Sequence, residues 1–322
     1  MKVVAAKDFY YLVVIGLVSL IGLVSSSKFK DLVVRTIGFI AYCFSRIKRK
    51  LIERNVSLAF EGQLSQQKLR NITIGALHGV WEEMLSWLPS DAKRSGVDQV
   101  RIHGMEQLRE ALEKGKGIIL WESNGFGIRI LAKKVLHANG FSVCQVHGVD
   151  NLGGFLTDDS EGTWVRSKWI KRFFDRCERH FVYAIINLPR ADSFAAARRL
   201  KNILKQNRIV CVSGDGKMGH KLMSFDFLGH NEFFATGMVS LAKLSGATIL
   251  PMFCIRERDG ERHLFIESPI PVHPDGDRES GFRMSLSRYV SLMESYIRAH
   301  PEQYRNWHIL GDQPLNLHSL NG

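Results

Sequence analysis

The sequence predicts an α/β protein with a mixed, mostly parallel sheet flanked by helices, preceded by a helical N-terminal region that anchors the chain to a membrane. Two observations carry this prediction. From about residue 101 onward, short apolar runs alternate with segments of helical periodicity, a pattern typical of parallel strands joined by crossover helices. Before that point the chain has apolar and helical patterns but no strand pattern. With 322 residues, 45% of them hydrophobic, the chain is long enough for one large core.

Residues 1–45 form the predicted anchor. Residues 9–27 carry no charged side chain and have about the length of a membrane-spanning helix. A second apolar stretch, residues 32–44, leads into the basic cluster of residues 46–50. Basic residues beside apolar segments mark the cytoplasmic side of a membrane and bind anionic lipids. We therefore expect a transmembrane or interfacial anchor here, rather than a signal peptide that is cleaved.

Residues 46–100 form the predicted helical N-terminal part. The first helix covers about residues 46–60. The second runs from Ser65, a helix-capping residue, to Trp87, and Pro89 ends it.

Residues 101–322 form the predicted α/β domain. Strands are expected at 102–104, 117–121, 141–147, 181–187, 209–213, 222–228, 248–256 and 262–268. Helices are expected at about 106–114, 127–138, 163–179, 194–206, 238–245 and 280–299.

The charge balance favours anionic partners. The chain has 44 Lys and Arg against 32 Asp and Glu, a formal net charge of +12. Membrane headgroups, phosphorylated substrates, acidic carrier proteins and nucleic acid all fit that balance. The five cysteines are scattered and form no CxxC pair, so we interpret them as reduced core cysteines of a domain that faces the cytoplasm. No His or Cys group has metal-ligand spacing, and neither a metal nor a cofactor is predicted.

The first candidate site is the loop of residues 122–129, which follows the apolar strand 117–121. It holds a carboxylate, an amide and a fixed cation, on Glu122, Asn124 and Arg129. In α/β folds, ligands collect at the carboxyl ends of strands, where helix N-terminal amides favour anions or developing oxyanions. The alternative is that Glu122 and Arg129 form a structural ion pair, and that Gly125 and Gly127 only allow the chain to turn.

The second candidate is the loop of residues 214–221, after the predicted strand 209–213. It contains Asp215, Lys217, His220 and Lys221, and its glycine spacing does not match a phosphate-binding P-loop. Clustered Lys and His suit contact with a phosphate or a pantetheine phosphate. A solvated basic loop is the alternative.

The third candidate is the basic segment 163–179, in which Arg and Lys alternate with Trp and Phe. That mixture can indicate nucleic-acid binding. At helical spacing beside a membrane anchor it favours an interfacial helix, so no nucleic-acid partner is expected.

Several sequence blocks, in one order, resemble the bacterial lipid A late acyltransferases (lauroyl and myristoyl transferases) of the lysophospholipid acyltransferase superfamily. The resemblance runs from about residue 46 to residue 310. The blocks are residues 50–60 (KLIERNVSLAF), 117–120 (GIIL), 210–215 (VCVSGD), 225–229 (FDFLG), 235–237 (ATG), 241–251 (LAKLSGATILP) and 300–304 (HPEQY).

This resemblance implies a glycerolipid acyltransferase-like fold at the bacterial inner membrane, with the catalytic domain facing the cytoplasm. The implied reaction moves a fatty acyl group from an acyl carrier protein or CoA thioester to a membrane lipid. In the family, the loop after the strand carries a His base and, five positions on, an Asp or Glu. The matching positions here hold Asn124 and Arg129, and neither an amide nor a guanidinium can serve as that base. Substrate-lining residues expected from the blocks are Asp215, Lys217, Gly229 and Thr236.

Three accounts of this departure remain open. In the first, Glu122 is the base with a pKa raised by burial, Asn124 donates to the oxyanion, and Arg129 orients Glu122 or holds a substrate anion. In the second, the acceptor is an amine, which needs less activation than a hydroxyl. In the third, the protein is a catalytically inactive homologue that binds acyl chains or an acyl carrier protein. Acyl transfer is the favoured function, and hydrolysis of an acyl thioester is a further alternative.

Overall fold

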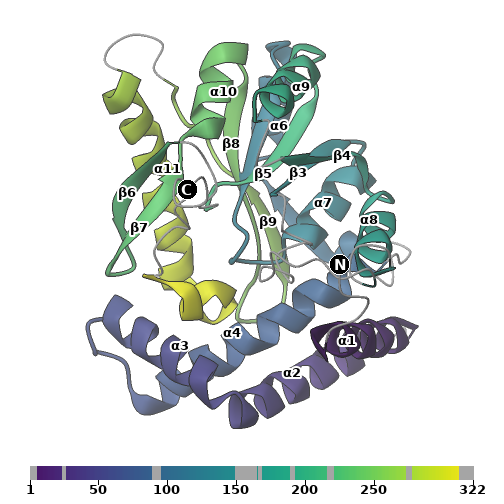
Figure 1. Ribbon diagram of the computed structural model, residues 1–322, viewed down its shortest axis with the longest axis vertical. Helices are drawn as coiled ribbons and strands as arrows, with labels where there is room; N and C mark the ends of the chain where they lie inside the picture. Colours follow the sequence, from purple (N-terminus) through teal and green to yellow (C-terminus); the bar gives the residue numbers. More distant parts are fainter. Residues whose placement is uncertain are drawn as a thin grey trace.

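Figure 1 shows the chain as a computed structural model. The structure describes residues 6–23, 27–88, 96–148, 165, 169–188, 193–215, 221–272 and 278–311. A seven-stranded sheet occupies the middle of the molecule, and the N-terminal helices lie together beneath it in this view.

The N-terminal helices are α1 (Ala6–Leu23), α2 (Ser27–Phe44), α3 (Arg46–Ala59) and α4 (Gln66–Trp87). The predicted cap of α4 is confirmed, because the Ser65 side chain accepts a hydrogen bond from the Lys68 backbone N–H. Among the described residues, no helix combines the length and the apolar character that crossing a membrane requires. The transmembrane span predicted for residues 9–27 is therefore not confirmed. Of those residues, α1 covers 9–23 and α2 begins at Ser27, and residues 24–26 lie outside the described ranges.

The large sheet has the strand order β1-β9-β8-β2-β5-β3-β4. All neighbouring strands are parallel except β8 and β9, which are antiparallel. The predicted mixed, mostly parallel sheet is confirmed. The strands are β1 (Val100–His103), β2 (Ile118–Glu122), β3 (Val143–Gly148), β4 (Val182–Leu188), β5 (Ile209–Ser213), β8 (Thr248–Arg256) and β9 (Arg262–Ile266).

Helices flank this sheet, as the sequence predicts. They are α6 (Met105–Glu113), α7 (Arg129–Ala138), α8 (Lys171–Glu178), α9 (Ser193–Lys205), α10 (Gly237–Ser245) and α11 (Arg278–Ala299). Short 3-10 helices are η1 (Val97–Gln99), η3 (Pro301–Gln303) and η4 (Arg305–Ile309). Much of the segment before Lys171 in the predicted basic helix lies outside the described residues.

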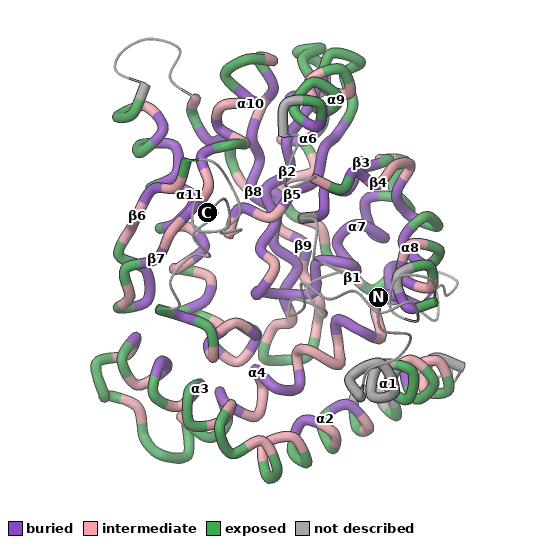
Figure 2. Tube along the Cα trace, viewed as in Figure 1, coloured by how far each residue is buried: buried purple, intermediate pink, exposed green. Residues whose placement is uncertain are grey.

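The core has two parts, one on each face of the sheet. Along β2, Ile119 and Trp121 belong to one buried cluster, and Ile118 and Leu120 belong to the other. Successive side chains of a strand point to opposite faces, so a strand that is covered on both sides is apolar throughout. Figure 2 shows this burial along the central strands and exposed positions on α1, α2 and α3.

The strand pattern predicts one element of a hairpin and misses the other. β6 (Leu222–Phe227) pairs with β7 (His230–Ala235), which the sequence presents as a loop because its first three residues are polar. Both residues of the connecting turn, Leu228 and Gly229, have positive φ angles of 53° and 76°. That conformation matches the tight turns which join antiparallel strands.

Candidate functional site

The first two candidate loops form one site because β2 and β5 are neighbouring parallel strands. Their register pairs Glu122 with Ser213, so the loops that follow both strands begin at the same edge of the sheet. The backbone N–H of Gly214 donates to the Glu122 carbonyl, and the Tyr289 hydroxyl of α11 donates to the same oxygen. The carboxyl ends of two strands thus bring Asn124 and Asp215 together, as the topology of such sheets favours.

Asp215 holds the loop after β2 by its carboxylate. Its Oδ2 accepts hydrogen bonds from Ser123 Oγ at 2.6 Å and from the Gly125 N–H at 3.2 Å. Its Oδ1 accepts the Asn124 N–H at 2.8 Å. Burial raises the pKa of Asp215 above its usual value, and the hydrogen bonds from the loop oppose that shift in part.

Asn124 is fixed at its backbone and at its side-chain oxygen. Ser213 Oγ donates to Asn124 Oδ1 at 2.7 Å, and an Arg305 NH2 group donates to the Asn124 carbonyl at 2.8 Å. Asn124 is only partly buried. No hydrogen bond joins its Nδ2 to another residue of the described ranges, so the amide presents its N–H donors at the strand end.

Arg305 supports the same loop and was missed by the sequence interpretation. Its backbone N–H donates to the Gly125 carbonyl at 2.6 Å, and its guanidinium also donates to the Gly127 carbonyl. The available signal was its position directly after the block of residues 300–304.

Glu122 lies in the interior, beneath this loop. The residue is 1% exposed, and its Oε1 is 3.1 Å from Lys133 Nζ, 3.5 Å from Arg129 NH1 and 3.2 Å from Gln145 Nε2. Burial by itself would raise the pKa of Glu122, but Lys133 and Arg129 outweigh it and hold that pKa below its usual value. The expectation of a base with a raised pKa is therefore wrong.

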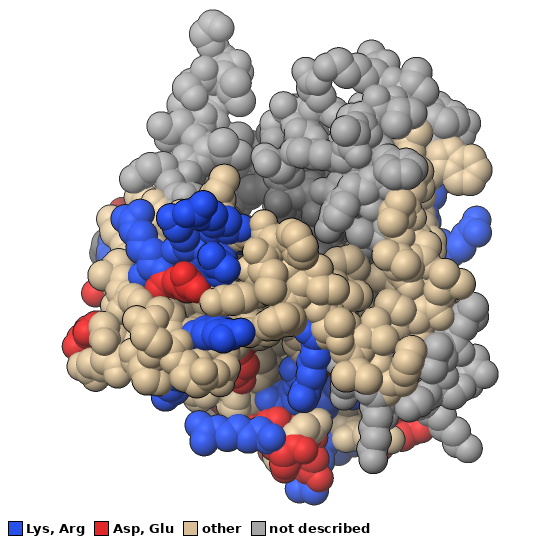
Figure 3. Space-filling model, turned by 90° about the horizontal axis from the view of Figure 1, so that it is seen from below, with Lys and Arg blue, Asp and Glu red and all other residues tan. Residues whose placement is uncertain are grey.

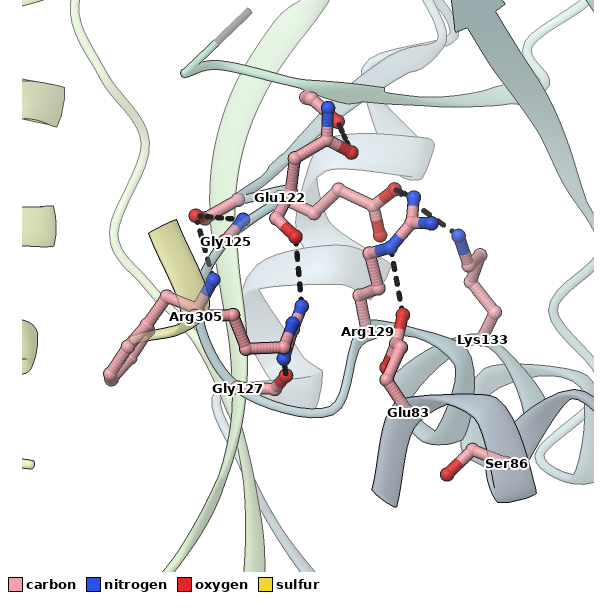
Figure 4. A network of polar contacts seen from close by, with 12 residues as sticks. Glu83, Ser86, Glu122, Gly125, Gly127, Arg129, Lys133 and Arg305 are labelled. Atoms are coloured by element: carbon pink, nitrogen blue, oxygen red, sulfur yellow. Dashed lines mark hydrogen bonds and ion pairs between the residues drawn. The ribbon is translucent and has the colours of Figure 1, made fainter. Parts of the chain in front are cut away.

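Arg129 also faces the interior. Its Nε is 2.8 Å from Glu83 Oε1 of α4, and its side chain is 3% exposed. Figure 4 shows the guanidinium between Glu83 and Glu122, with the Lys133 ammonium beside it and also paired with Glu122. A guanidinium enclosed in this way cannot hold a substrate anion. The arrangement matches the structural ion pair, and the contact with Glu83 was not predicted.

Two of the remaining predicted site residues, Gly229 and Thr236, lie elsewhere. Gly229 occupies the β6–β7 turn, where a Cβ would lie 3.3 Å from Leu58 Cγ of α3. Thr236 is buried at the start of α10, and its N–H and hydroxyl both donate to the Lys221 carbonyl. Neither residue forms a hydrogen bond with the loop of residues 122–129 within the described ranges. Lys217 lies outside the described residues.

Comparisons with known proteins find similarity to acyltransferases. The bacterial lipid A biosynthesis acyltransferases match residues 179–309, a range that includes Asp215 and Arg305 and begins after the loop of residues 122–129. The lipid A biosynthesis lauroyltransferase of Escherichia coli (strain K12) is 24% identical over 279 residues, which are 83% of this chain and 80% of that protein. The phosphatidylinositol mannoside acyltransferase of Mycolicibacterium smegmatis is 22% identical over 234 residues, or 72% and 68% of the two chains.

Proposed function

Because this chain is a divergent member of the lipid A acyltransferase family and an enzyme of the acyltransferase class, we propose that it transfers a fatty acyl group from an acyl carrier protein or CoA thioester to a hydroxyl or amine of a membrane lipid. One observation carries the proposal. At the position of the family's base, the backbone N–H of Asn124 donates to the Asp215 carboxylate, and Ser213 Oγ holds the side-chain amide through its oxygen.

Asn124 supplies the electrostatic part of this reaction. Attack on a thioester carbonyl places negative charge on its oxygen, and the Nδ2 group of Asn124 is the donor that stabilises this charge. Ser213 holds the amide oxygen, and Asp215 and Arg305 hold the backbone, so the donor needs little reorganisation. Glu122 and Arg129 act as positioning residues, because their ion pairs fix the end of β2 against the start of α7.

Asp215 serves as the base that accepts the proton of the acceptor hydroxyl, the role that the His has in the family. Its carboxylate accepts three hydrogen bonds out of about four that it can accept, which leaves one acceptor position. The acceptor hydroxyl gives its proton to Asp215 as its oxygen bonds to the carbonyl carbon. The carbon–sulfur bond then breaks, and the departing thiolate takes the proton from Asp215 and leaves as a thiol. The raised pKa of Asp215 makes it a stronger base than an ordinary carboxylate.

The N-terminal helices suit the surface of a membrane. Exposed large apolar side chains gather on them: Leu12, Val13, Leu17, Leu20, Phe29, Leu32, Phe39, Ile40, Phe44, Ile47, Leu51 and Leu58. Exposed basic residues lie among these, at Arg35, Arg46, Lys50 and Arg54. Figure 3, seen from the side of these helices, shows uncharged surface interrupted by Lys and Arg and by smaller patches of Asp and Glu. Helices with this composition bind in the interfacial plane of an anionic bilayer, so we place the enzyme at the cytoplasmic face of a bacterial inner membrane.

A product search tests this function. The purified protein is incubated with acyl carrier protein and CoA thioesters and a membrane lipid extract, and acylated products are identified by mass spectrometry. We expect a product that is lost in Asn124→Ala and in Asp215→Asn, and that persists in Asn202→Ala, which removes an exposed amide on α9. Absence of product with every donor, together with retention of bound lipid, would instead indicate a non-catalytic homologue.

A further inference from the structure

Helix α8 has a basic outer face. Its residues are not part of the Asn124 loop. Arg172, Arg176, Arg179 and His180 are exposed, and they line one surface pocket together with Asp175. The three arginines follow each other at spacings of four and three residues, which places them on one side of the helix. Over this span the face extends about 10 Å along the helix axis.

The apolar side chains of α8 face inward. Phe174 and Cys177 are buried, and the Phe174 ring makes an edge contact with Trp87 of α4 at 5.2 Å between centroids. A helix that binds in a membrane interface turns its apolar face to the lipid. The interfacial interpretation of this segment is therefore wrong for α8, although Trp169, just before it, is exposed. The outer face of α8 can bind a partner only through charge and hydrogen bonds.

We propose that this face, defined by Arg172, Arg176, Arg179 and His180, is the docking surface for an acidic protein that delivers the acyl thioester. The inference rests on the proposed acyl transfer and specifies its donor as carrier protein rather than free CoA. Charge complementarity supports it, because the three arginines outnumber the single acidic residue of the pocket, Asp175. Arginine pairs with carboxylates in a bidentate geometry, which suits rows of Asp and Glu on a partner helix.

The inner face of α8 connects this surface to the buried network under the site. Glu178 is 1% exposed, and its Oε2 is 2.7 Å from His147 Nε2 on β3. His147 lies two residues after Gln145, so both side chains are on one face of the strand, and Gln145 donates to Glu122. Trp87 contacts Phe174 on one side, and the Arg129 guanidinium lies 6.0 Å from its ring centroid. The docking helix is thus packed on the elements that hold the end of β2.

Direct binding tests this proposal without relying on turnover. The affinity of the full chain for holo acyl carrier protein is measured by titration at low and at physiological salt. We expect binding that weakens with salt, and a loss of about 10-fold or more in the double variant Arg172→Glu/Arg176→Glu. The matched control Arg109→Glu/Arg198→Glu reverses two exposed charges on α6 and α9 and should bind like the wild type.

Two results would overturn it. One is unchanged affinity of the α8 variant for the carrier protein. The other is unchanged carrier binding with reduced binding to vesicles that contain phosphatidylglycerol, which would make the face a lipid contact. In turnover assays the α8 variant should raise KM for the carrier-bound thioester and leave KM for acyl-CoA unchanged. Failure of all turnover would reject the proposed function, whereas the binding titration would still decide the docking surface.

Discussion

Arg129 Nε lies 2.8 Å from Glu83 Oε1, and both side chains are almost inaccessible, at 3% and 1% exposure. Arg129 is therefore a buried cation that neutralises a carboxylate from α4. The same guanidinium is 3.5 Å from Glu122, so two buried carboxylates depend on it. An acidic residue at position 129 would add a carboxylate to an interior that already holds Glu83, Glu122 and Glu178.

Removing Arg129 should destabilise the fold strongly. Arg129→Met leaves Glu83 buried without its closest cation, and breaking a buried ion pair costs about 3–5 kcal/mol in the free energy of unfolding. Urea denaturation at neutral pH measures this loss. Arg101→Met removes the arginine of an exposed pair with Glu261 and should cost no more than about 1 kcal/mol. Equal effects of the two substitutions would contradict the assignment of Arg129 to a stabilising buried ion pair with Glu83.

The stability contributed by Glu122 should depend on pH in a defined direction. The pKa of Glu122 in the folded protein is below 4.5, because Lys133 and Arg129 favour its ionised form. Its contribution is complete above the unfolded pKa of about 4.3 and is lost as the pH falls through the lower, folded pKa. The difference in unfolding free energy between wild type and Glu122→Gln should therefore be constant from pH 5 to 8 and shrink below about pH 4.

Urea titrations at several pH values measure that difference. The exposed Glu110→Gln on α6 serves as control and should give a small difference at every pH. A difference for Glu122→Gln that grows toward low pH would mean that Glu122 is a carboxyl with a raised pKa.

Ser213 should influence the rate through Asn124. Ser213→Ala removes the hydroxyl that donates to Asn124 Oδ1 and lets the amide rotate, so kcat should fall about 10-fold. Asn124→Ala removes the proposed oxyanion donor itself and should cost about 10²- to 10³-fold in kcat. Ser213→Thr keeps the hydroxyl and should retain most of the activity. Steady-state kinetics at saturating donor compare the three variants, and a wild-type kcat in Ser213→Ala would rule out this positioning role.

The pH profile of the reaction should report Asp215. A base must be ionised, and burial raises the pKa of Asp215 above 3.8, so kcat/KM should fall with decreasing pH with a midpoint above 3.8. The profile is measured with a hydroxyl acceptor that does not titrate in this range. Asp215→Asn should remove this acid limb together with most of the activity. An acid limb that persists in the residual activity of Asp215→Asn would assign the proton transfer to another group.

Gly214 should tolerate no side chain. A Cβ there would lie 2.5 Å from two ring atoms of Tyr289 and 2.8 Å from Trp121. These two rings are stacked with their centroids 4.4 Å apart, and both are buried, so they cannot move aside without disturbing the core. Gly214→Ala should therefore lower the unfolding free energy by about 1–3 kcal/mol. Gly237→Ala, where a Cβ meets nothing within 4 Å, should stay within about 1 kcal/mol of wild type in the same denaturation assay.

Particular elements show where prediction from the sequence succeeds. The uninterrupted apolar run of β2 predicts a strand covered on both faces, and Ser65 marks the start of α4. β7 was missed because its first three residues are polar and have no strand pattern of their own. Its strand conformation depends on backbone pairing with β6. The burial of Glu122 was missed for a related reason. Its surroundings come from α4, α7 and β3, which are distant in sequence from one another.

The sequence by itself determined most of the elements, the mostly parallel sheet and the loop at which β2 ends. These follow from local apolar periodicity and from the short turns that join neighbouring elements. Only the tertiary structure decided which groups the polar residues of that loop contact. The parallel register of β2 and β5 places Asp215 under Asn124, and the packing of α4 on α7 encloses Arg129 with Glu83. The pKa of a carboxylate depends on burial and on charges within a few ångströms, and segments distant in sequence supply both.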